Sequence, residues 1–317
     1  MRELSAALIT AQKAAASEPY VSLRASSKAA GVVRLDWDRL YTGEENNYLH
    51  GMAIAGDGSM TRACITPPAD SGMLYYQRVT APGTESDFSQ WTYSGQYSAV
   101  AVAAAACGAE VSIFWAKDNR EIRRMKSADY GATWGSAELV DYSNSQAVSG
   151  LAAAYASGGD LALFFADIDT LYVKEHAGGS WQPKSAWDKT TGNLSGVGCV
   201  YDGDWQLILT GQDSSGNYKV WSLACGDGGE VEDGAWSELH EVASAPSGGD
   251  YEYGHPSLDK PDVFRCRYME KFGGTTAYNR PFGSHALPGT AYTEGMWLEP
   301  VPFNASPACG LAMAHGG

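Results

Sequence analysis

The order of hydrophobic and polar positions repeats along the chain with a period of roughly fifty residues. Three stretches beginning at Ala99, Val148 and Leu194 share it: "AVAVAAAACGAEVSIFWAK", "VSGLAAAYASGGDLALFFAD" and "LSGVGCVYDGDWQLILTG". In each, a run of small residues is followed by a Gly or Asp turn and then by bulky aliphatic and aromatic residues. A polar-flanked segment and a segment led by tryptophan come next. Four short strands that recur at this spacing predict a β-propeller.

The order within each repeat matches the physical demands on a propeller blade. The first strand lies nearest the central axis, where blades crowd together, so small residues are needed there. The next strands pack against neighbouring blades, which suits bulky residues. A β-sandwich and a parallel β-helix also alternate strands with turns, but a sandwich would not repeat the same small-then-bulky order five times.

One tryptophan in each repeat sets the phase of the blades. These marker tryptophans are Trp91, Trp134, Trp181, Trp236 and Trp297. They predict blades at residues 48–95, 96–143, 144–192, 193–250 and 251–304. We expect a short attachment helix at 1–19 and a propeller over 20–317, with the strand at 305–317 completed by strands from 20–42. Five complete blades and one shared blade would make six; the alternative is a fragment of a longer chain, cut within the next repeat.

Charge and the N-terminal segment narrow the classes of function. The chain has 22 Lys and Arg against 37 Asp and Glu, a net charge of −15 at pH 7. This balance argues against nucleic-acid binding, which needs clustered cations to release counterions. No run approaches the roughly 18 apolar residues of a membrane span. The segment "MRELSAALITAQKAAASEP" is a poor secretory signal, so we expect a protein made in the cytoplasm without a Sec signal peptide.

Candidate metal and cofactor ligands are sparse. The six cysteines are widely separated, which indicates buried small apolar residues rather than disulfides or a zinc site. The histidines never reach metal-ligand spacing. Asp167 and Asp169, and likewise Asp202 and Asp204, could bind Ca²⁺, although both stretches also suit hairpin turns. We expect no cofactor, with Ca²⁺ at these acidic turns as the alternative, and the sequence leaves open whether the chain forms a homo-oligomer.

The stretch "SADYGATW" resembles the S-x-D-x-G-x-T-W Asp-box of sialidase-like propellers, and degenerate copies occur at the same phase of other repeats. The matching residues are Ser127, Asp129, Gly131, Thr133 and Trp134. We expect Asp129 to cap backbone N–H groups, Gly131 to supply a positive φ and Trp134 to pack under the turn. The resemblance implies that such turns lie on the face opposite the catalytic site, so function is expected on the other face.

Catalytic residues of a sialidase are not identifiable. The resemblance implies three arginines, a Tyr–Glu nucleophile pair and an acid/base Asp, with one arginine in a Phe/Tyr-Arg-Ile-Pro motif that "VVRLDW" and "MTRACIT" do not match. Arg265 and Arg267 alternate along a strand with Tyr268 and Glu270, so the two pairs point to opposite faces. Another kind of glycosidase needs two carboxylates at a set distance, which sequence alone does not locate. Catalysis is left undecided, and the residues favour a non-catalytic protein.

Aromatic side chains on predicted loops are candidates for stacking on sugars. They are Trp187, Trp205, Tyr251, Tyr253 and His255. A short helix, a strand-rich segment and then a propeller resemble the layout of tail-associated proteins of phages and prophages. We therefore expect a non-catalytic virion protein, structural or receptor- or glycan-binding, whose partners are other tail subunits or a cell-surface glycan. The alternatives are a sialidase-like glycoside hydrolase or lyase, and a bacterial surface interaction propeller.

Overall fold

The computed structural model describes most of the chain between residues 22 and 303, and towards either end of it the backbone alone. The described ranges are 22–28, 32–38, 49–66, 71–80, 91–144, 148–156, 158–187, 192–201, 203–225, 236, 239–244, 252–259, 265–272, 276–283, 296–297 and 301–303. Within them every regular element is a β-strand. The helix expected at 1–19 and the closing strand expected at 305–317 lie outside the described residues.

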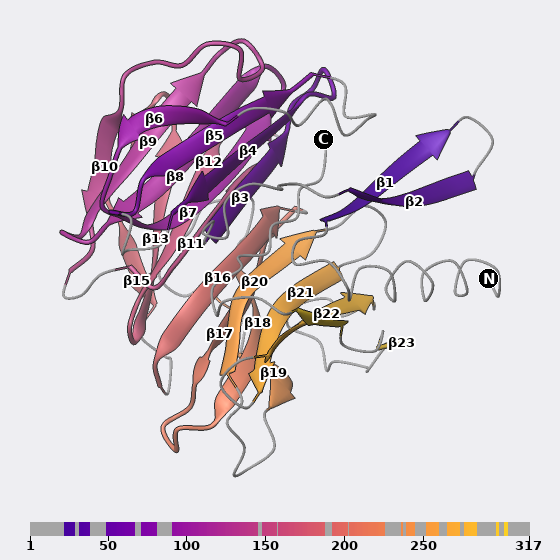
Figure 1. Cartoon of the computed structure of the whole chain (residues 1–317). Coiled ribbons are helices and arrows are strands. Elements are labelled where there is room, and N and C mark those ends of the chain that lie inside the picture. Colours follow the sequence, from indigo (N-terminus) through magenta and orange to yellow (C-terminus); the bar gives the residue numbers. More distant parts are fainter. Residues whose placement is uncertain are drawn as a thin grey trace.

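Five antiparallel sheets follow one another along the chain, and each is one blade (Figure 1). Blade 1 contains β3 (Leu49–Ile54), β4 (Met60–Ile65), β5 (Leu74–Val79) and β6 (Thr92–Gln96). Blade 2 contains β7 (Ala99–Cys107), β8 (Glu110–Lys117), β9 (Glu121–Ser127) and β10 (Glu138–Tyr142). Blade 3 contains β11 (Gly150–Tyr155), β12 (Leu161–Asp167), β13 (Thr170–Ala177), β14 (Ser180–Trp181) and β15 (Ser185–Trp187). The fold is the predicted β-propeller of four-stranded blades.

The later blades repeat this order. Blade 4 contains β16 (Leu194–Tyr201), β17 (Trp205–Gln212), β18 (Tyr218–Cys225) and β19 (His240–Ser244). Blade 5 contains β20 (Glu252–Asp259), β21 (Arg265–Phe272), β22 (Thr276–Gly283), β23 (Met296–Trp297) and β24 (Val301–Phe303). In blades 3 and 5 the outer strand is interrupted, so two short strands pair with the same neighbour, β13 or β22.

Before blade 1, β1 (Ser22–Lys28) and β2 (Val32–Asp38) pair with each other as an antiparallel hairpin. These strands fall within the segment 20–42 that the sequence assigns to a shared blade. Because 305–317 lies outside the described residues, the closure of that blade by both ends of the chain stays a prediction.

The innermost strands of consecutive blades, β3, β7, β11, β16 and β20, lie against one another (Figure 1). Their spacing leaves no room for ordinary side chains at the closest points. A Cβ atom placed on Gly150 of β11 would lie 2.7 Å from the Cα atom of Gly196 in β16. One placed on Gly51 of β3 would lie 2.8 Å from the backbone carbonyl carbon of Ala103 in β7. The small residues of each first strand are therefore a steric requirement.

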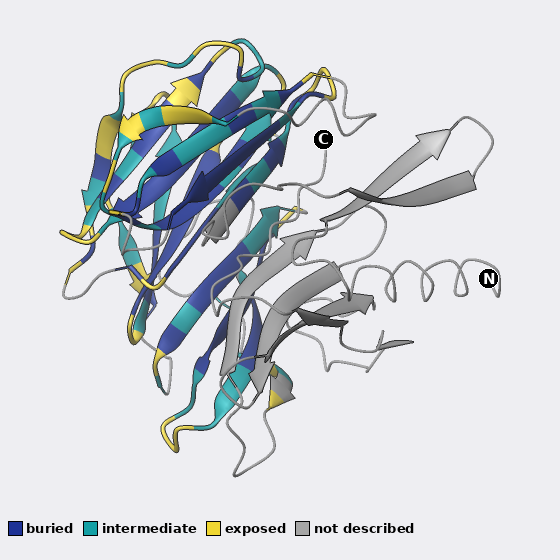
Figure 2. Cartoon of the chain, in the orientation of Figure 1, coloured by how far each residue is buried: buried dark blue, intermediate teal, exposed yellow. Residues whose placement is uncertain are grey.

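The second strands carry the bulky core. Every residue of β12 is buried, and so is nearly every residue of β8 and β17 (Figure 2). Because alternate side chains of a strand point to opposite faces, β8 and β12 each contribute to two interfaces, one with each neighbouring blade. Phe165 thus packs in the cluster shared with blade 2, whereas Phe164 packs in the cluster shared with blade 4.

Three of the marker tryptophans, Trp134, Trp181 and Trp236, join their blade to the one before it. We call such a contact between consecutive blades a seam. The ring centroid of Trp134 in blade 2 lies 5.3 Å from that of Tyr76 in blade 1. Trp181 of blade 3 lies edge-on to Phe114 of blade 2 at 6.2 Å. Trp236 of blade 4 lies edge-on to Phe164 of blade 3 at 6.4 Å. The repeated tryptophan is therefore an interblade packing residue.

We expect Gly150→Ala to destabilise the propeller by about 1–3 kcal/mol, because the added methyl group overpacks the contact between β11 and β16. Gly158→Ala is the matched control, since nothing lies within 4 Å of a Cβ atom there, and its effect should stay within about 0.5 kcal/mol. Thermal and urea unfolding of the two variants measures the difference. Equal stability of both would contradict the steric explanation for the small inner strands.

Candidate functional site

The turn at 127–134 is held together by its own polar side chains. The backbone N–H of Thr133 donates to Asp129 Oδ1 at 2.8 Å, and the hydroxyl of Thr133 donates to Asp129 Oδ2 at 2.7 Å. Ser127 Oγ donates to Asp129 Oδ1 at 2.7 Å and accepts from the N–H of Gly131 at 2.8 Å. Gly131 has φ of 80°. Asp129 and Gly131 thus adopt the turn-forming roles that the sequence predicts.

The same turn also attaches blade 2 to blade 1, which sequence reasoning did not anticipate. The carbonyl oxygen of Tyr130 accepts hydrogen bonds from Arg78 Nε at 2.6 Å and from Ser59 Oγ at 3.2 Å. Arg78 is held in place by an ion pair with Asp57, at 3.2 Å. Trp134 lies beneath the turn and packs on Tyr76 of blade 1. The carboxylate of Asp129 and the carbonyl oxygen of Tyr130 are thus both bonded within the protein, which supports a structural role.

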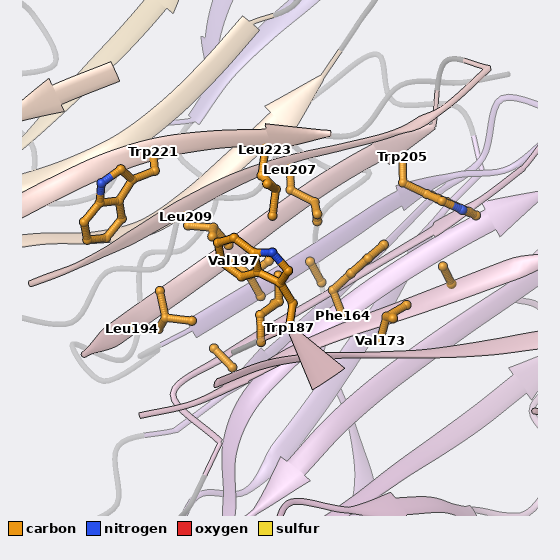
Figure 3. Close-up of a cluster of buried hydrophobic side chains, with 14 of the residues drawn as sticks. Phe164, Val173, Trp187, Leu194, Val197, Trp205, Leu207, Leu209, Trp221 and Leu223 are labelled. Atoms are coloured by element: carbon orange, nitrogen blue, oxygen red, sulfur yellow. The ribbon is translucent and has the colours of Figure 1, made fainter. Parts of the chain in front are cut away.

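Two of the candidate sugar-stacking residues are core residues instead. Trp187 is 4% exposed and Trp205 is 0% exposed, and both lie in the hydrophobic cluster between blades 3 and 4 (Figure 3). Trp205 packs edge-on against Phe164 at 5.8 Å. Their flat apolar rings fill the seam, so neither ring face is open to a sugar. Tyr251 and the side chains of Tyr253 and His255 lie outside the described part of the chain.

The structure brings together a set of mostly polar side chains at the seam between blades 2 and 3, which we call the seam cluster. Its members are Glu110, Ser112, Arg124, Lys126, Glu138, Tyr155, His176 and Trp181. Five of them come from β8, β9 and β10 of blade 2, and three come from β11, β13 and β14 of blade 3. The cluster therefore exists only where two blades meet.

Arg124 is the centre of the seam cluster. Its Nε donates to Ser112 Oγ at 2.9 Å, and its Nη2 donates to Glu110 Oε1 at 2.7 Å and to Tyr155 OH at 3.3 Å. Nη1 lies 3.5 Å from Glu138 Oε1. The guanidinium carbon is 5.7 Å from the ring centroid of Trp181, a cation–π distance. The guanidinium group thus lies among two carboxylates, two hydroxyls and an indole ring.

Strand register explains how the members meet. Arg124 pairs with Phe114 of β8 on one side and with Glu138 of β10 on the other, so these three residues form one row across blade 2. In blade 3, the row that ends β11 runs from Tyr155 through Leu161 to His176 and Trp181. The adjacency of β7 and β11 places the two rows against each other.

The charged residues of the seam cluster differ in exposure: Arg124 forms a buried floor, and Glu110, Lys126 and Glu138 form a more exposed rim. The side chain of Arg124 is 2% exposed, whereas those of Glu110, Lys126 and Glu138 are 29%, 43% and 52% exposed. Tyr155, His176 and Trp181 are half-buried. A ligand at this seam would meet carboxylate and ammonium groups first, with the guanidinium group beneath them.

The protonation states of Glu110, Tyr155 and His176 suit binding better than catalysis. Partial burial acts to raise the pKa of Glu110, but hydrogen bonds from Lys126 and Tyr155 and the charges of Lys126 and Arg124 outweigh it and lower that pKa. Burial raises the pKa of Tyr155 above its usual range. Burial and the nearby cations lower the pKa of His176. At neutral pH the cluster therefore presents an ionised glutamate, an intact phenol and a neutral imidazole.

Tyr155 and Glu110 form a tyrosine–glutamate hydrogen bond of 2.8 Å, the kind of pair that a sialidase nucleophile requires. A nucleophilic tyrosine must lose its proton, and a raised pKa makes that harder. At neutral pH the phenol of Tyr155 thus stays protonated and donates to Glu110, an arrangement that suits binding better than nucleophilic attack.

The seam cluster lies at the same end of the sheets as the turn at 127–134, because both occur where β9 ends and β10 begins. The sequence placed function on the opposite face. One signal was readable: Ile122 and Arg124 occupy alternate, buried positions of β9, so the strand carries a charge on its core-facing side. Its partner Tyr155 belongs to the next blade, which no local pattern identifies.

The chain is similar in fold to solved β-propeller lectins, one of which is described as six-bladed. A fungal lectin from Aleuria aurantia, in complex with Fucα1-6GlcNAc, superposes with a TM-score of 0.53 and 12% identity over 86% of each chain. AofleA from Arthrobotrys oligospora gives 0.51 and 13%, over 86% of this chain and 77% of its own. The SapL1 lectin, in complex with α-methyl fucoside, gives 0.50 and 11%, over 86% of each chain.

At these identities the likeness extends to the fold alone. No protein-family model matches the sequence, and no curated protein matches it. The residues of the seam must therefore be interpreted on their own chemistry.

The acidic turns and cysteines add no metal centre among the described residues. There, no three His, Cys, Asp or Glu side chains are grouped so as to hold a metal ion. Asp167 is fully buried, and Asp202 is not described. Cys64 is buried, Cys107 and Cys199 are half-buried, and all three are free thiols. No described helix has the length and apolar character needed to cross a membrane.

We expect Asp129→Asn to lower the melting temperature at neutral pH, and we expect this difference to shrink in acid. Hydrogen bonds from the side chain and the backbone N–H of Thr133, then from Ser127, lower the pKa of Asp129 from 3.8 to about 2. The ionised carboxylate stabilises the folded state above the ordinary pKa, and this stabilisation is lost as the pH falls towards the folded value. Melting curves from neutral pH to about pH 2 measure the effect.

Asp118→Asn, at an exposed turn of the same blade, is the control for the loss of one negative charge. A difference between wild type and Asp129→Asn that stays constant throughout the acid range would contradict the capping role of the carboxylate.

Proposed function

We propose that this chain is a non-catalytic, glycan-binding propeller that serves as a tail-associated virion protein, either structural or receptor-binding. The observation that carries the glycan-binding half of the proposal is the seam cluster. It combines a buried guanidinium group, ionised carboxylates and a half-buried indole ring at the edge between two blades.

This combination suits a sugar for chemical reasons. Each sugar hydroxyl both donates and accepts hydrogen bonds, so a site that holds carboxylate acceptors beside guanidinium and ammonium donors can satisfy it in both directions. The C–H face of the sugar ring is apolar and packs on an aromatic ring such as that of Trp181. Binding sites of this kind pair a few placed polar groups with aromatic surface.

The structural neighbours suggest which ligand to try first. The Aleuria aurantia lectin and the SapL1 lectin have been solved in complex with Fucα1-6GlcNAc and with α-methyl fucoside, respectively. Because this chain has the same fold and a polar seam, neutral fucosides are the first ligands to test. The sequence of the turn at 127–134 supports the further proposal that the propeller is of the sialidase-like Asp-box type.

The virion role rests on the layout of the sequence. A helical pattern at 1–19 and strands within 20–42 precede the propeller. In this proposal the chain is made in the cytoplasm, joins other tail subunits through its N-terminal segment and meets a cell-surface glycan after lysis. The alternatives are a glycoside hydrolase, favoured by the Tyr155–Glu110 hydrogen bond, and a bacterial surface propeller.

We expect Trp181→Ala to weaken glycan binding by about tenfold or more, as the loss of an aromatic contact at the centre of a site does. Trp134→Ala is the matched control, because its ring also packs on the preceding blade but lies at a different seam. Both variants should melt at lower temperature, and only Trp181→Ala should lose affinity. Calorimetric titration with methyl α-L-fucopyranoside, guided by a glycan array, measures the difference.

Equal affinity of both tryptophan variants would contradict the seam as the binding site. Turnover of a fluorogenic glycoside that disappears in Glu110→Gln would favour the hydrolase instead.

We expect the chain to co-purify with phage-like particles after host lysis and its gene to lie between tail-tube and lysis genes. Mass spectrometry of purified particles and the gene neighbourhood test this. Recovery of the chain only from the envelope of cells that release no particles would favour the bacterial surface alternative.

A further inference from the structure

We infer that Glu138 makes the seam cluster selective for uncharged glycans and excludes anionic sugars. The inference rests on the proposed glycan-binding function and concerns the class of sugar that the same seam accepts. Glu138 acts here as a specificity-determining residue at the rim.

The hydrogen-bonding capacity of Arg124 is largely used within the protein. Nε is bound by Ser112, and Nη2 is bound by Glu110 and Tyr155. Nη1 forms a long ion pair with Glu138 at 3.5 Å, which leaves no room for an atom between the two groups. Glu138 is the more exposed of the pair, so a ligand can reach Nη1 only by bridging the two groups from the solvent side or by displacing Glu138.

The other cation of the cluster is also occupied. Lys126 forms an ion pair with Glu110, which already accepts from Arg124 and Tyr155. An incoming anion therefore finds no cation without a carboxylate beside it. Glu110 sits between both cations and is held by three donors, so Glu138 is the carboxylate that an anionic ligand would have to displace.

The charges of the cluster already balance. Arg124 and Lys126 supply two positive charges, Glu110 and Glu138 supply two negative charges, and His176 is neutral at pH 7 because its pKa is lowered. A hydroxyl group that bridges Nη1 and Glu138 from the solvent side accepts from the first and donates to the second without changing this balance. A carboxylate at that place would be repelled by Glu138 and, at longer range, by a chain with a net charge of −15.

The experiment uses the full chain and the substitution Glu138→Gln, which keeps the size of the side chain and removes its charge. Affinities are measured at constant ionic strength for one neutral probe, methyl α-L-fucopyranoside, and for two anionic probes, the methyl glycosides of glucuronic acid and N-acetylneuraminic acid. Glu241→Gln is the matched control. Glu241 lies on the outer strand of blade 4, pairs with Lys219 at 2.8 Å and is 51% exposed, against 52% for Glu138.

We expect the wild type to bind the neutral probe and to bind both anionic probes at least fivefold more weakly, the factor for about 1 kcal/mol of partly exposed ionic interaction. Glu138→Gln should raise the affinity for the anionic probes by about fivefold and lower that for the neutral probe by a similar factor, because a neutral acceptor replaces a charged one. The gain for anions should shrink in high salt. Glu241→Gln should change neither affinity.

Wild-type affinity for an anionic probe equal to that for the neutral probe would overturn the inference while leaving the glycan-binding function intact. An unchanged ratio of affinities in Glu138→Gln, or the same change in Glu241→Gln, would overturn the role of Glu138 specifically. Binding of neither class by any of the proteins would remove the proposed function and this inference with it.

Discussion

The close approach of the innermost strands is the constraint on which the rest of the propeller depends. At the contact between β11 and β16, two glycines face each other at a spacing that a single Cβ atom would fill. Side chains large enough to form a core are excluded from that position, so the core must form further out, on the second strands. β12, for example, is buried on both faces and therefore joins blade 3 to both of its neighbours. The distribution of small and bulky residues along each repeat follows directly.

The blades share one architecture, but the seams between them differ in chemistry. At the seam between blades 3 and 4 the contact is aromatic and aliphatic, built around Phe164 and Trp205. At the seam between blades 1 and 2, a carbonyl oxygen of the turn accepts from Arg78. The seam between blades 2 and 3 contains a buried arginine, and further along it Lys174 pairs with Asp141 at 2.7 Å. Among the three seams whose side chains the structure describes, the one between blades 2 and 3 thus contains a buried arginine that bonds polar groups of both blades.

Much of the fold could be predicted from the sequence because it depends on local, repeated patterns. The blade period, the strand order and the turn at 127–134 all follow from residues close together in the chain, and the interactions of Asp129 with Thr133 span four residues. The candidate site was harder. The sequence pattern placed Trp187 and Trp205 on loops. In the structure both rings lie in the seam, because burying their large apolar area is favourable. Tyr155 and Arg124 are 31 residues apart and belong to different blades.

The sequence by itself thus determined the repeat, the small inner strands, the bulky second strands and the capped turn, since each depends on sterics and hydrogen bonds within one blade. Only the tertiary structure decided which side chains of blade 3 meet those of blade 2. That pairing depends on the register of both sheets and on the face that each strand turns toward its neighbour. Alternation along a strand indicates that a residue such as Arg124 points inward, and the position of the next blade decides what it touches.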